Sequence, residues 1–380
     1  MYGSNSKRLL LLSMACLWCI HTWAQALSDP RATPKARQLY QQLHTLSQTG
    51  ILLGQEDALA YGVDWKEQPG RSDMKDMLGS HPAVVGWDLG DLDQTAHNLD
   101  TVHFGSMCRW IKDVYRMGGI NTISWHLDNP VSGGSSWDKT PAVAQLLPGG
   151  THHQVYKQRL DELARYLKKC RVGFTKVPII LRPFHEHNGT WFWWGKDYCT
   201  EEEYIALFRF TVDYLRQEKR MHQLLIAFSP DRSRMRTPNH REDYLYGYPG
   251  DEYVDIIGLD NYWDVGRHHN QVPLAEQPAH LVSSLELIVQ LAEEKGKVAA
   301  LTETGLEFTP HPTWFTDMLL EPLKSSPQAQ KIAYLMLWRN AGYWHYYTPY
   351  PGHPTAPDYR AFGQDELILL QKDLPPLYRR

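Results

Sequence analysis

The amino-acid sequence predicts a (β/α)8 TIM barrel, in which eight parallel strands form a ring surrounded by helices. Eight short apolar runs recur along the chain, each bounded by turn residues. The runs are almost continuously hydrophobic rather than alternating, as in parallel strands that are covered on both faces. Helical periodicity fills the intervals between them, and eight successive strand–helix units close into a barrel.

The eight expected strands are residues 51–53, 83–87, 121–125, 177–181, 224–228, 254–258, 298–302 and 334–338. Apolar residues at positions 156, 160, 163 and 167, and again at 281, 285, 288 and 292, recur with the period of an amphipathic helix. Gly296 is placed to end the second of these helices. Thr200 and Glu203 predict a capping box at the start of another helix.

The longest connection follows the third expected strand and covers residues 128–153. It is rich in Gly, Ser and Pro. Because the loops after barrel strands surround the active site, we expect this loop to lie over the catalytic face. No sequence repeat or low-complexity linker interrupts the chain, so a single domain is expected to fill residues 27–380.

The first 26 residues have the pattern of a signal peptide. Lys7 and Arg8 precede an apolar run over residues 9–23, and Ala24-Gln25-Ala26 supplies a cleavage site. The run has roughly 15 residues, fewer than the ~20 that span a bilayer, so no integral membrane span is expected. We therefore expect export to the periplasm or the outside of the cell. A lipid anchor on Cys16 is less favoured, because Ser13 is a poor match for the aliphatic residue usual at that position.

Composition excludes several classes of function. With 42% hydrophobic and 22% charged residues, the chain is neither collagen-like, coiled-coil nor disordered. The net charge of -4 becomes -6 without residues 1–26, because that segment holds two basic residues and no acidic one. A nucleic-acid partner is therefore not expected. The 14 Trp and 21 Tyr against 10 Phe favour rings that stack on a ligand and also form hydrogen bonds, as sugar sites require.

Three cysteines remain after residue 26, namely Cys108, Cys170 and Cys199. They lie far apart in the sequence, so they do not form a disulfide framework, and at most one pair can form. A chain of this length has a large enough core to fold without such a framework.

Two glutamates follow expected strands. Glu186 comes directly after the fourth strand and precedes four aromatic residues at 191–194, and Glu303 lies at the end of the seventh strand. Because barrel enzymes gather catalytic groups at the carboxyl ends of strands, the two carboxylates are expected to converge on one cavity. Glycosidic hydrolysis uses such a pair. Burial against tryptophan and a nearby negative charge should raise the pKa of the acid partner.

These residues also have other interpretations. A glutamate at a strand end is often a structural ion-pair partner, and the four aromatic residues are of a kind that also packs as core. His185-Glu186-His187 suggests a zinc site, but the spacing His-Glu-x-x-His is absent, so we expect no metal and no other cofactor. Esterase, phosphate-loop and dinucleotide motifs are also absent from the sequence.

Three segments together resemble glycoside hydrolase family 26, most of whose members are β-mannanases. They are Arg182-Pro183-Phe184-His185-Glu186 with residues 188–195, residues 254–263, and Thr302-Glu303-Thr304-Gly305. The resemblance spans nearly all of residues 27–380. It implies that Glu186 is the acid/base, that Glu303 is the nucleophile, and that the anomeric configuration is retained.

The same resemblance implies a set of substrate-binding residues. His185 corresponds to the family histidine that contacts the sugar or tunes the nucleophile, Trp191 to the tryptophan that flanks the cleavage point, and Tyr262 to the tyrosine that orients the nucleophile. Polar and stacking residues of the sugar sites are matched by His126, Trp338 and Arg339, and less firmly by Trp137 in the long loop.

The leading hypothesis is a metal-independent, retaining glycoside hydrolase acting on β-1,4 bonds of mannan-type hemicellulose, such as mannan, galactomannan or glucomannan. A second hypothesis keeps the machinery but changes the polysaccharide to a mixed-linkage β-glucan or a xylan. A third is a catalytically inactive carbohydrate-binding protein. Cleavage within the polysaccharide and cleavage from its end are both compatible with the sequence, and no oligomeric state is predicted.

Overall fold

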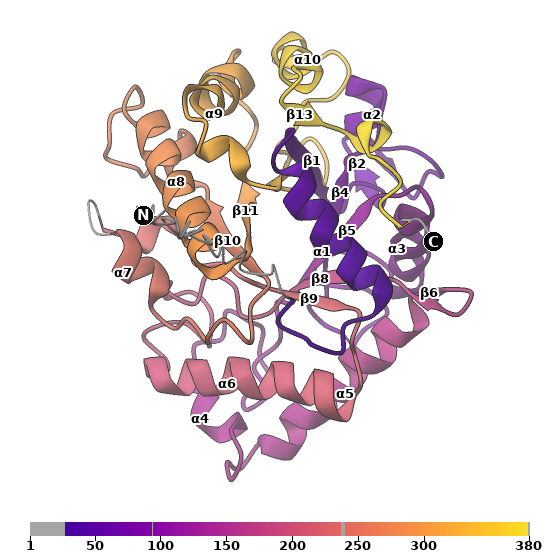
Figure 1. The fold of residues 1–380 in the computed structure, drawn as a ribbon, viewed down its shortest axis with the longest axis vertical. Coiled ribbons are helices and arrows are strands. Elements are labelled where there is room, and N and C mark those ends of the chain that lie inside the picture. Colours follow the sequence, from indigo (N-terminus) through magenta and orange to yellow (C-terminus); the bar gives the residue numbers. More distant parts are fainter. Residues whose placement is uncertain (1–26, 93, 237–239, 379–380) are drawn as a thin grey trace, which may run out of the picture.

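The computed structural model describes residues 27–92, 94–236 and 240–378 (Figure 1). The predicted signal peptide, residues 1–26, lies outside the described residues. Among the residues that are described, no helix combines the length and the apolar character needed to cross a bilayer.

Eight parallel strands close into a barrel, which confirms the predicted (β/α)8 fold. Each expected run overlaps one barrel strand. Neighbouring strands follow chain order around the ring, and β12 pairs back to β1 to close it, with Leu335 opposite Leu53. The barrel strands are β1 (Ile51–Glu56), β4 (Val84–Asp88), β5 (Ile120–Ser124), β8 (Ile179–Arg182), β9 (Leu224–Phe228), β10 (Ile256–Asn261), β11 (Val298–Thr304) and β12 (Tyr334–Leu337).

Helices follow the barrel strands and pack around them (Figure 1). The predicted helical signals are confirmed: α6 begins with the capping box of Thr200 and Glu203, and α8 ends at Gly296, whose φ of 65° is left-handed. The principal helices are α1 (Pro34–Leu46), α2 (Asp73–Leu78), α3 (Phe104–Arg116), α5 (His153–Lys169), α6 (Glu201–Asp213), α7 (His240–Leu245), α8 (Gln277–Lys295), α9 (Glu321–Ser325) and α10 (Ala356–Gln364).

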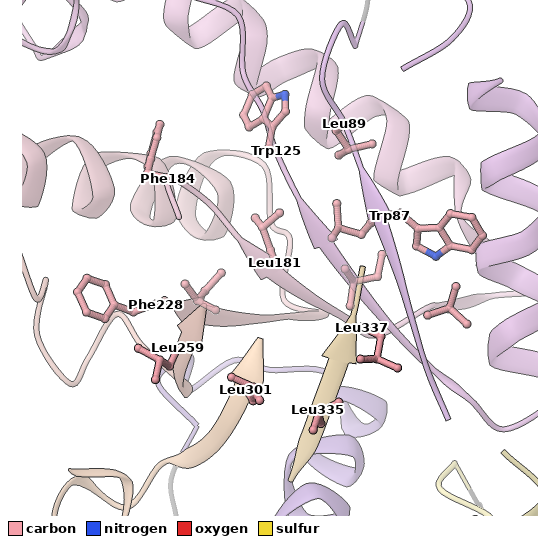
Figure 2. Close-up of a cluster of buried hydrophobic side chains, with 14 of the residues drawn as sticks. Trp87, Leu89, Trp125, Leu181, Phe184, Phe228, Leu259, Leu301, Leu335 and Leu337 are labelled. Atoms are coloured by element: carbon pink, nitrogen blue, oxygen red, sulfur yellow. The ribbon is translucent and has the colours of Figure 1, made fainter. Parts of the chain in front are cut away.

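The strands contribute to two separate apolar layers because successive side chains point to opposite faces. In β9, Leu224, Ile226 and Phe228 belong to the layer between the strands and the helices, part of which Figure 2 shows. Leu225 and Ala227 belong to the inner layer. The inner layer also contains the buried face of α1, which lies in front of the strands in Figure 1, so α1 closes one end of the barrel.

Several short elements were not predicted from the sequence. A ninth strand, β13 (Ile368–Leu369), pairs in parallel with the start of β1 beside the barrel. The long loop after β5 contains a single helical turn, α4 (Val143–Leu146). Two small hairpins and two π-helical turns are further additions. They are β2 (Tyr61–Gly62) with β3 (Trp65–Lys66), β6 (Arg171–Val172) with β7 (Thr175–Lys176), η1 (Tyr214–Glu218) and η4 (Thr316–Leu320).

Candidate active site

A cavity of about 550 Å³ opens at the carboxyl ends of the barrel strands. Eight of the nine residues predicted for the site line it, drawn from segments that follow or end five different strands. They are His126, Trp137, His185, Glu186, Trp191, Tyr262, Glu303 and Trp338. The structure thus brings together side chains that are up to about two hundred residues apart in the sequence.

The backbone that carries Glu186 has an unusual conformation. After β8 ends, Phe184 and Glu186 adopt φ values of 50° and 54°, in the left-handed region that non-glycine residues rarely occupy. The Glu186 amide donates to the carbonyl of Ser229 at 2.8 Å, which fastens this turn to the end of β9. Backbone strain held in place by such bonds is typical of functional sites, and it directs the Glu186 side chain towards the cavity.

Asn188 also stabilises this turn by hydrogen bonds. Its side-chain amide donates to the Asp231 carbonyl and its oxygen accepts from the Asp231 amide, each at 2.8 Å. The segment after β8 is therefore bound to the segment after β9 by two further hydrogen bonds, and both segments line the cavity.

The Glu186 carboxyl group is in an environment that favours its protonated form. Burial, followed by the negative charges of Asp231 and Asp260, raises its pKa well above the usual value, and Arg182 opposes the shift. The indole nitrogen of Trp191 donates to Oε2 of Glu186 at 2.7 Å and fixes the orientation of the group. A carboxyl group held in this way is suited to deliver a proton.

Glu303 is in a contrasting environment. The Arg182 guanidinium donates to Oε1 in an ion pair, and the Tyr262 hydroxyl donates to Oε2 at 3.0 Å. A cation and a hydroxyl donor stabilise negative charge on this carboxylate. Because each oxygen accepts a hydrogen bond, the orientation of the Glu303 carboxylate is fixed.

Arg182 is the residue that connects the acidic groups at the barrel mouth. It donates to Oδ2 of Asp260 at 2.6 Å as well as to Glu303, and Asp260 in turn accepts a hydrogen bond from the Thr302 hydroxyl at 2.6 Å. Arg182 belongs to a segment that resembles the family, but the sequence does not predict its role, because its partners come from distant strands.

The two glutamates face one another across the cavity. Oxygens of Glu186, Asp260 and Glu303 all lie within 4.8 Å of one another. Retaining glycosidases separate their carboxyl groups by about 5–5.5 Å and inverting ones by about 6.5–9.5 Å, so this spacing fits the retaining class. Three carboxylates are also a potential metal-binding group, but the guanidinium of Arg182 already pairs with two of them, and its charge repels a cation.

Two histidines in the site have pKa values that are shifted in opposite directions. His126 Nδ1 lies 2.8 Å from Oδ2 of Asp88. Burial opposes protonation of His126, but the Asp88 charge outweighs it and raises the pKa of the ring. His185 is fully buried, and burial, together with the charges of Arg182 and His126, lowers its pKa well below the usual value. The two neighbouring rings therefore have pKa values shifted in opposite directions, upwards at His126 and downwards at His185.

The four aromatic residues after Glu186 divide between the cavity and the core. Trp191 and Phe192 line the cavity, whereas Trp193 and Trp194 are completely buried. The indole nitrogens of Trp193 and Trp194 donate to the carbonyls of Leu127 and His185 at 2.8 and 2.9 Å. Core packing, the alternative interpretation of the four aromatic residues, thus holds for these two, which support the loops beneath the site.

Trp137 also faces the cavity, although it comes from the long loop after β5. Its ring stacks on that of His126 with centroids 5.3 Å apart and planes 17° apart, and it contacts Phe192 at 5.6 Å. The side chain is 48% exposed, so one face of the indole is accessible to a ligand.

Arg339 differs from the other predicted site residues because it does not line this cavity. It forms an ion pair with Asp100 at 2.8 Å and approaches the Tyr61 hydroxyl at 3.3 Å. It therefore lies among residues that follow β1 and β4, outside the set of residues that line this cavity.

The cavity contains further residues that sequence reasoning missed. All of them come from segments that follow a barrel strand, and that position was the one available signal. They are Asp231, Ser233 and Arg234 after β9, Trp263, Arg267 and His269 after β10, and Tyr347 after β12. Arg234 lies over the ring of Trp191 at 5.1 Å, a cation–π contact on one face of that indole.

Comparison with known proteins identifies the family. The sequence model described as glycosyl hydrolase family 26 matches residues 28–324. The chain belongs to glycoside hydrolase family 26. The match includes both glutamates, whereas Trp338 and Arg339 lie beyond its end.

Related proteins of this family cover most of the chain. A mannan endo-1,4-beta-mannosidase of Bifidobacterium adolescentis is 31% identical over 361 residues, which is 90% of this chain but 35% of that protein. The chain thus spans about a third of this curated relative and less than half of the next.

Among solved structures, a beta-mannanase of the family from Bacteroides ovatus has a TM-score of 0.84 and 37% identity, with 92% of this chain and 98% of that chain covered. An endo-beta-1,4-mannanase double mutant from Cellulomonas fimi has a TM-score of 0.85 and 34% identity, with 93% and 80% covered.

Proposed function

We propose that this family 26 protein is a retaining glycoside hydrolase that cleaves β-1,4-mannosidic bonds in mannan-type polysaccharides. The observation that carries the proposal is the separation of the Glu186 and Glu303 oxygens, which lie within 4.8 Å of each other in a cavity lined by aromatic rings. Two carboxyl groups at this spacing fit a double displacement on one pyranose ring.

In the first half of the proposed reaction, Glu186 gives its proton to the glycosidic oxygen and Glu303 attacks the anomeric carbon. The glycosidic bond breaks and a covalent glycosyl-enzyme forms. In the second half, Glu186, now a carboxylate, takes a proton from a water molecule, which attacks the same carbon and releases Glu303. The raised pKa of Glu186 and the two donors on Glu303 prepare each group for its first step.

The proposed substrate rests on two kinds of support. The relatives named above are described as mannosidases and mannanases. The cavity itself offers the accessible rings of Trp137, Trp191 and Trp338 for the apolar face of a sugar, with His126 and Tyr262 among them as hydrogen-bonding groups.

A time course followed by proton NMR tests the mechanism. During early hydrolysis of linear β-1,4-mannan, the new reducing end should appear first as the β-anomer and then mutarotate. First appearance of the α-anomer would overturn the retaining mechanism. The E303A variant should release no reducing sugar under the same conditions.

A polysaccharide panel tests the substrate. Reducing-sugar release should be fastest on mannan, galactomannan or glucomannan, and far slower on mixed-linkage β-glucan and xylan. Preference for either of the last two would replace the mannan proposal. Binding to mannan without turnover of any of these polysaccharides would make the protein a carbohydrate-binding one.

We also propose that the chain is exported, with cleavage after Ala26. The support is the pattern of Lys7 and Arg8, an apolar run and a small-residue cleavage site. Amino-terminal sequencing of protein recovered from the periplasm or medium of the expressing cell should begin at Leu27. Retention of the intact chain in the cytoplasm would contradict export.

A further inference from the structure

Two cysteines that are distant in the sequence meet on the outer side of the barrel. Cys108 lies within α3 and Cys170 directly follows α5, and their sulfur atoms are 3.0 Å apart. By comparison, Sγ of Cys170 is 3.7 Å from the nearest backbone carbonyl that it contacts, that of Tyr166. The contact with the Cys108 sulfur is therefore the shorter of these two contacts of the Cys170 sulfur.

We infer that Cys108 and Cys170 form a disulfide bond in the mature protein. A disulfide has a sulfur–sulfur bond of about 2.05 Å, so the two atoms need to approach by about 1 Å. The helices that carry them are already held together by other contacts. The Tyr166 hydroxyl donates to the Phe104 carbonyl at 2.9 Å, and the two rings pack edge to face with centroids 5.7 Å apart.

The chemistry of the pair fits thiol–disulfide exchange. Cys108 is 8% exposed and Cys170 is 1% exposed, so an oxidant meets Cys108 first. The Cys170 thiol donates a hydrogen bond to the Cys108 sulfur, and with the help of Lys112 this lowers the pKa of Cys108 to about 6, against the effect of burial. Cys108 is thus the nucleophile of the pair.

The oxidant is a disulfide of the exported compartment, either a dithiol–disulfide oxidoreductase or oxidised glutathione. The Cys108 thiolate attacks one sulfur of this disulfide and expels a thiolate, which leaves a mixed disulfide. Cys170 loses its proton and attacks Cys108, forming the internal bond and expelling the second thiolate. Two cysteine thiols are oxidised and one external disulfide is reduced to two thiols.

The bond encloses a part of the chain that serves the active site. Residues 108–170 include β5, His126 and the long loop that carries Trp137. Closing a ring of this size restricts the unfolded chain, and the chain-entropy relation together with the usual unfolding entropy of a domain predicts a melting temperature raised by roughly 5 °C. The disulfide thus fastens the base of the segment that shapes one side of the cavity.

Cys199 supplies the matched control. Its sulfur contacts the carbonyls of Trp194 and Gly195 at 3.6 and 3.7 Å, and no other sulfur lies within bonding distance among the described residues. Cys199 should therefore stay a free thiol under conditions that oxidise the other two.

Peptide mapping of the folded protein tests the inference. The protein is incubated with oxidised glutathione, alkylated in denaturant and analysed by mass spectrometry without reduction. The expected result is one cross-linked species joining the peptides of Cys108 and Cys170, with the alkyl group on Cys199. Alkylation of both Cys108 and Cys170, or a glutathione adduct on each, would overturn it.

Thermal unfolding supplies the second readout. The oxidised wild type and the C199S variant should each melt roughly 5 °C higher than their reduced forms. The C108A and C170A variants should show no dependence on the redox state. Equal melting temperatures of the oxidised and reduced wild type would refute the stabilising role.

Only the place where the bond forms rests on the proposed export. Oxidation of the purified protein tests the pairing independently of location and of any activity on mannan. If the disulfide forms in the purified protein but is absent from protein recovered from cells, then it does not form in the mature protein, and the oxidising compartment is contradicted as well. The hydrolase proposal is unaffected by this result.

Discussion

The Tyr262 hydroxyl donates a 3.0 Å hydrogen bond to Oε2 of Glu303, on the carboxylate that Arg182 holds from its other oxygen. The phenol and the guanidinium together leave Glu303 little freedom to rotate. Because one bond to a charged group contributes about 1.5–3 kcal/mol, each of these contacts is large enough to influence the rate.

The Y262F variant should lower kcat/KM on mannan by about 10- to 100-fold, the equivalent of that hydrogen bond. The loss should fall mainly on kcat, because the orientation of Glu303 matters most in the transition state. Steady-state kinetics check this, with Y253F as the control, since the Tyr253 hydroxyl bonds Asp213 away from the site. A loss confined to KM would contradict an orienting role.

The E186A variant separates the acid from the nucleophile. It should lose activity on mannan by about 10²- to 10⁴-fold, because the departing sugar oxygen needs a proton. A dinitrophenyl β-mannoside, whose leaving group departs as a stable anion, should still form the glycosyl-enzyme at a substantial rate. Burst-phase kinetics measure the rate of glycosyl-enzyme formation. If E186A lowers this rate equally on both substrates, Glu186 is not the acid.

The pH profile should report the raised pKa of Glu186. Its proton must be present for the first step, so kcat/KM should fall as pH rises through that pKa. The Asp231 charge is the largest electrostatic contribution to the raised value, so D231N should move this alkaline limb to lower pH. The surface variant D161N should not shift the alkaline limb of the kcat/KM profile. If D231N leaves this limb unchanged or shifts it to higher pH, the limb does not report the pKa of Glu186.

Trp191 and Trp193 are two residues apart but should respond differently to substitution. W191A removes the donor to Glu186 and should lower kcat/KM by about 10- to 100-fold with a small change in stability. W193A empties a fully buried position and should cost about 3–5 kcal/mol of unfolding free energy. Denaturant unfolding and steady-state kinetics of both variants distinguish the catalytic effect at Trp191 from the stability effect at Trp193. A large loss of stability in W191A would contradict this distinction.

The Asp88–His126 pair should stabilise the protein within a limited pH range. The pKa of His126 is raised from 6.5, so its contribution is complete below that value and is lost as pH rises through the raised pKa. The pKa of Asp88 is lowered from 3.8, so its contribution is lost only as pH falls through the lowered pKa. Breaking the pair with D88N should cost about 3 kcal/mol between these limits. Unfolding at several pH values checks this, and a cost independent of pH would contradict it.

The strands and the main helices were predictable because their signal is local. An apolar run such as residues 224–228 needs burial on both faces wherever it folds, and the capping box of Thr200 and Glu203 requires only four residues. By contrast, β13 is two residues long and exists through its pairing with β1, more than three hundred residues earlier. No local pattern marks such a strand.

The candidate site was predictable where it depends on position after a strand. Glu186, Glu303 and Tyr262 lie at strand ends, and the barrel brings strand ends together. The pairings of Arg182 with Asp260 and of His126 with Asp88 were not predictable, because they depend on side-chain directions across neighbouring strands. Whether Trp193 and Trp194 line the cavity or pack in the core likewise depends on the loop that covers them rather than on their residue type.

The ion pair of Arg182 with Glu303 has a consequence for how charge moves during turnover. In the proposed reaction, the negative charge resides on Glu303 beside the guanidinium before attack. In the glycosyl-enzyme, the ester is neutral and the anion is Glu186 instead. The summed charge of these three side chains is therefore the same in both states, and the anion relocates by less than 5 Å, since the two groups lie within 4.8 Å. Asp260, 2.6 Å from Arg182, remains a hydrogen-bonding partner of the arginine while the ester persists. The proposed first step thus moves the negative charge between two neighbouring carboxyl groups and leaves the total charge of the three side chains unchanged.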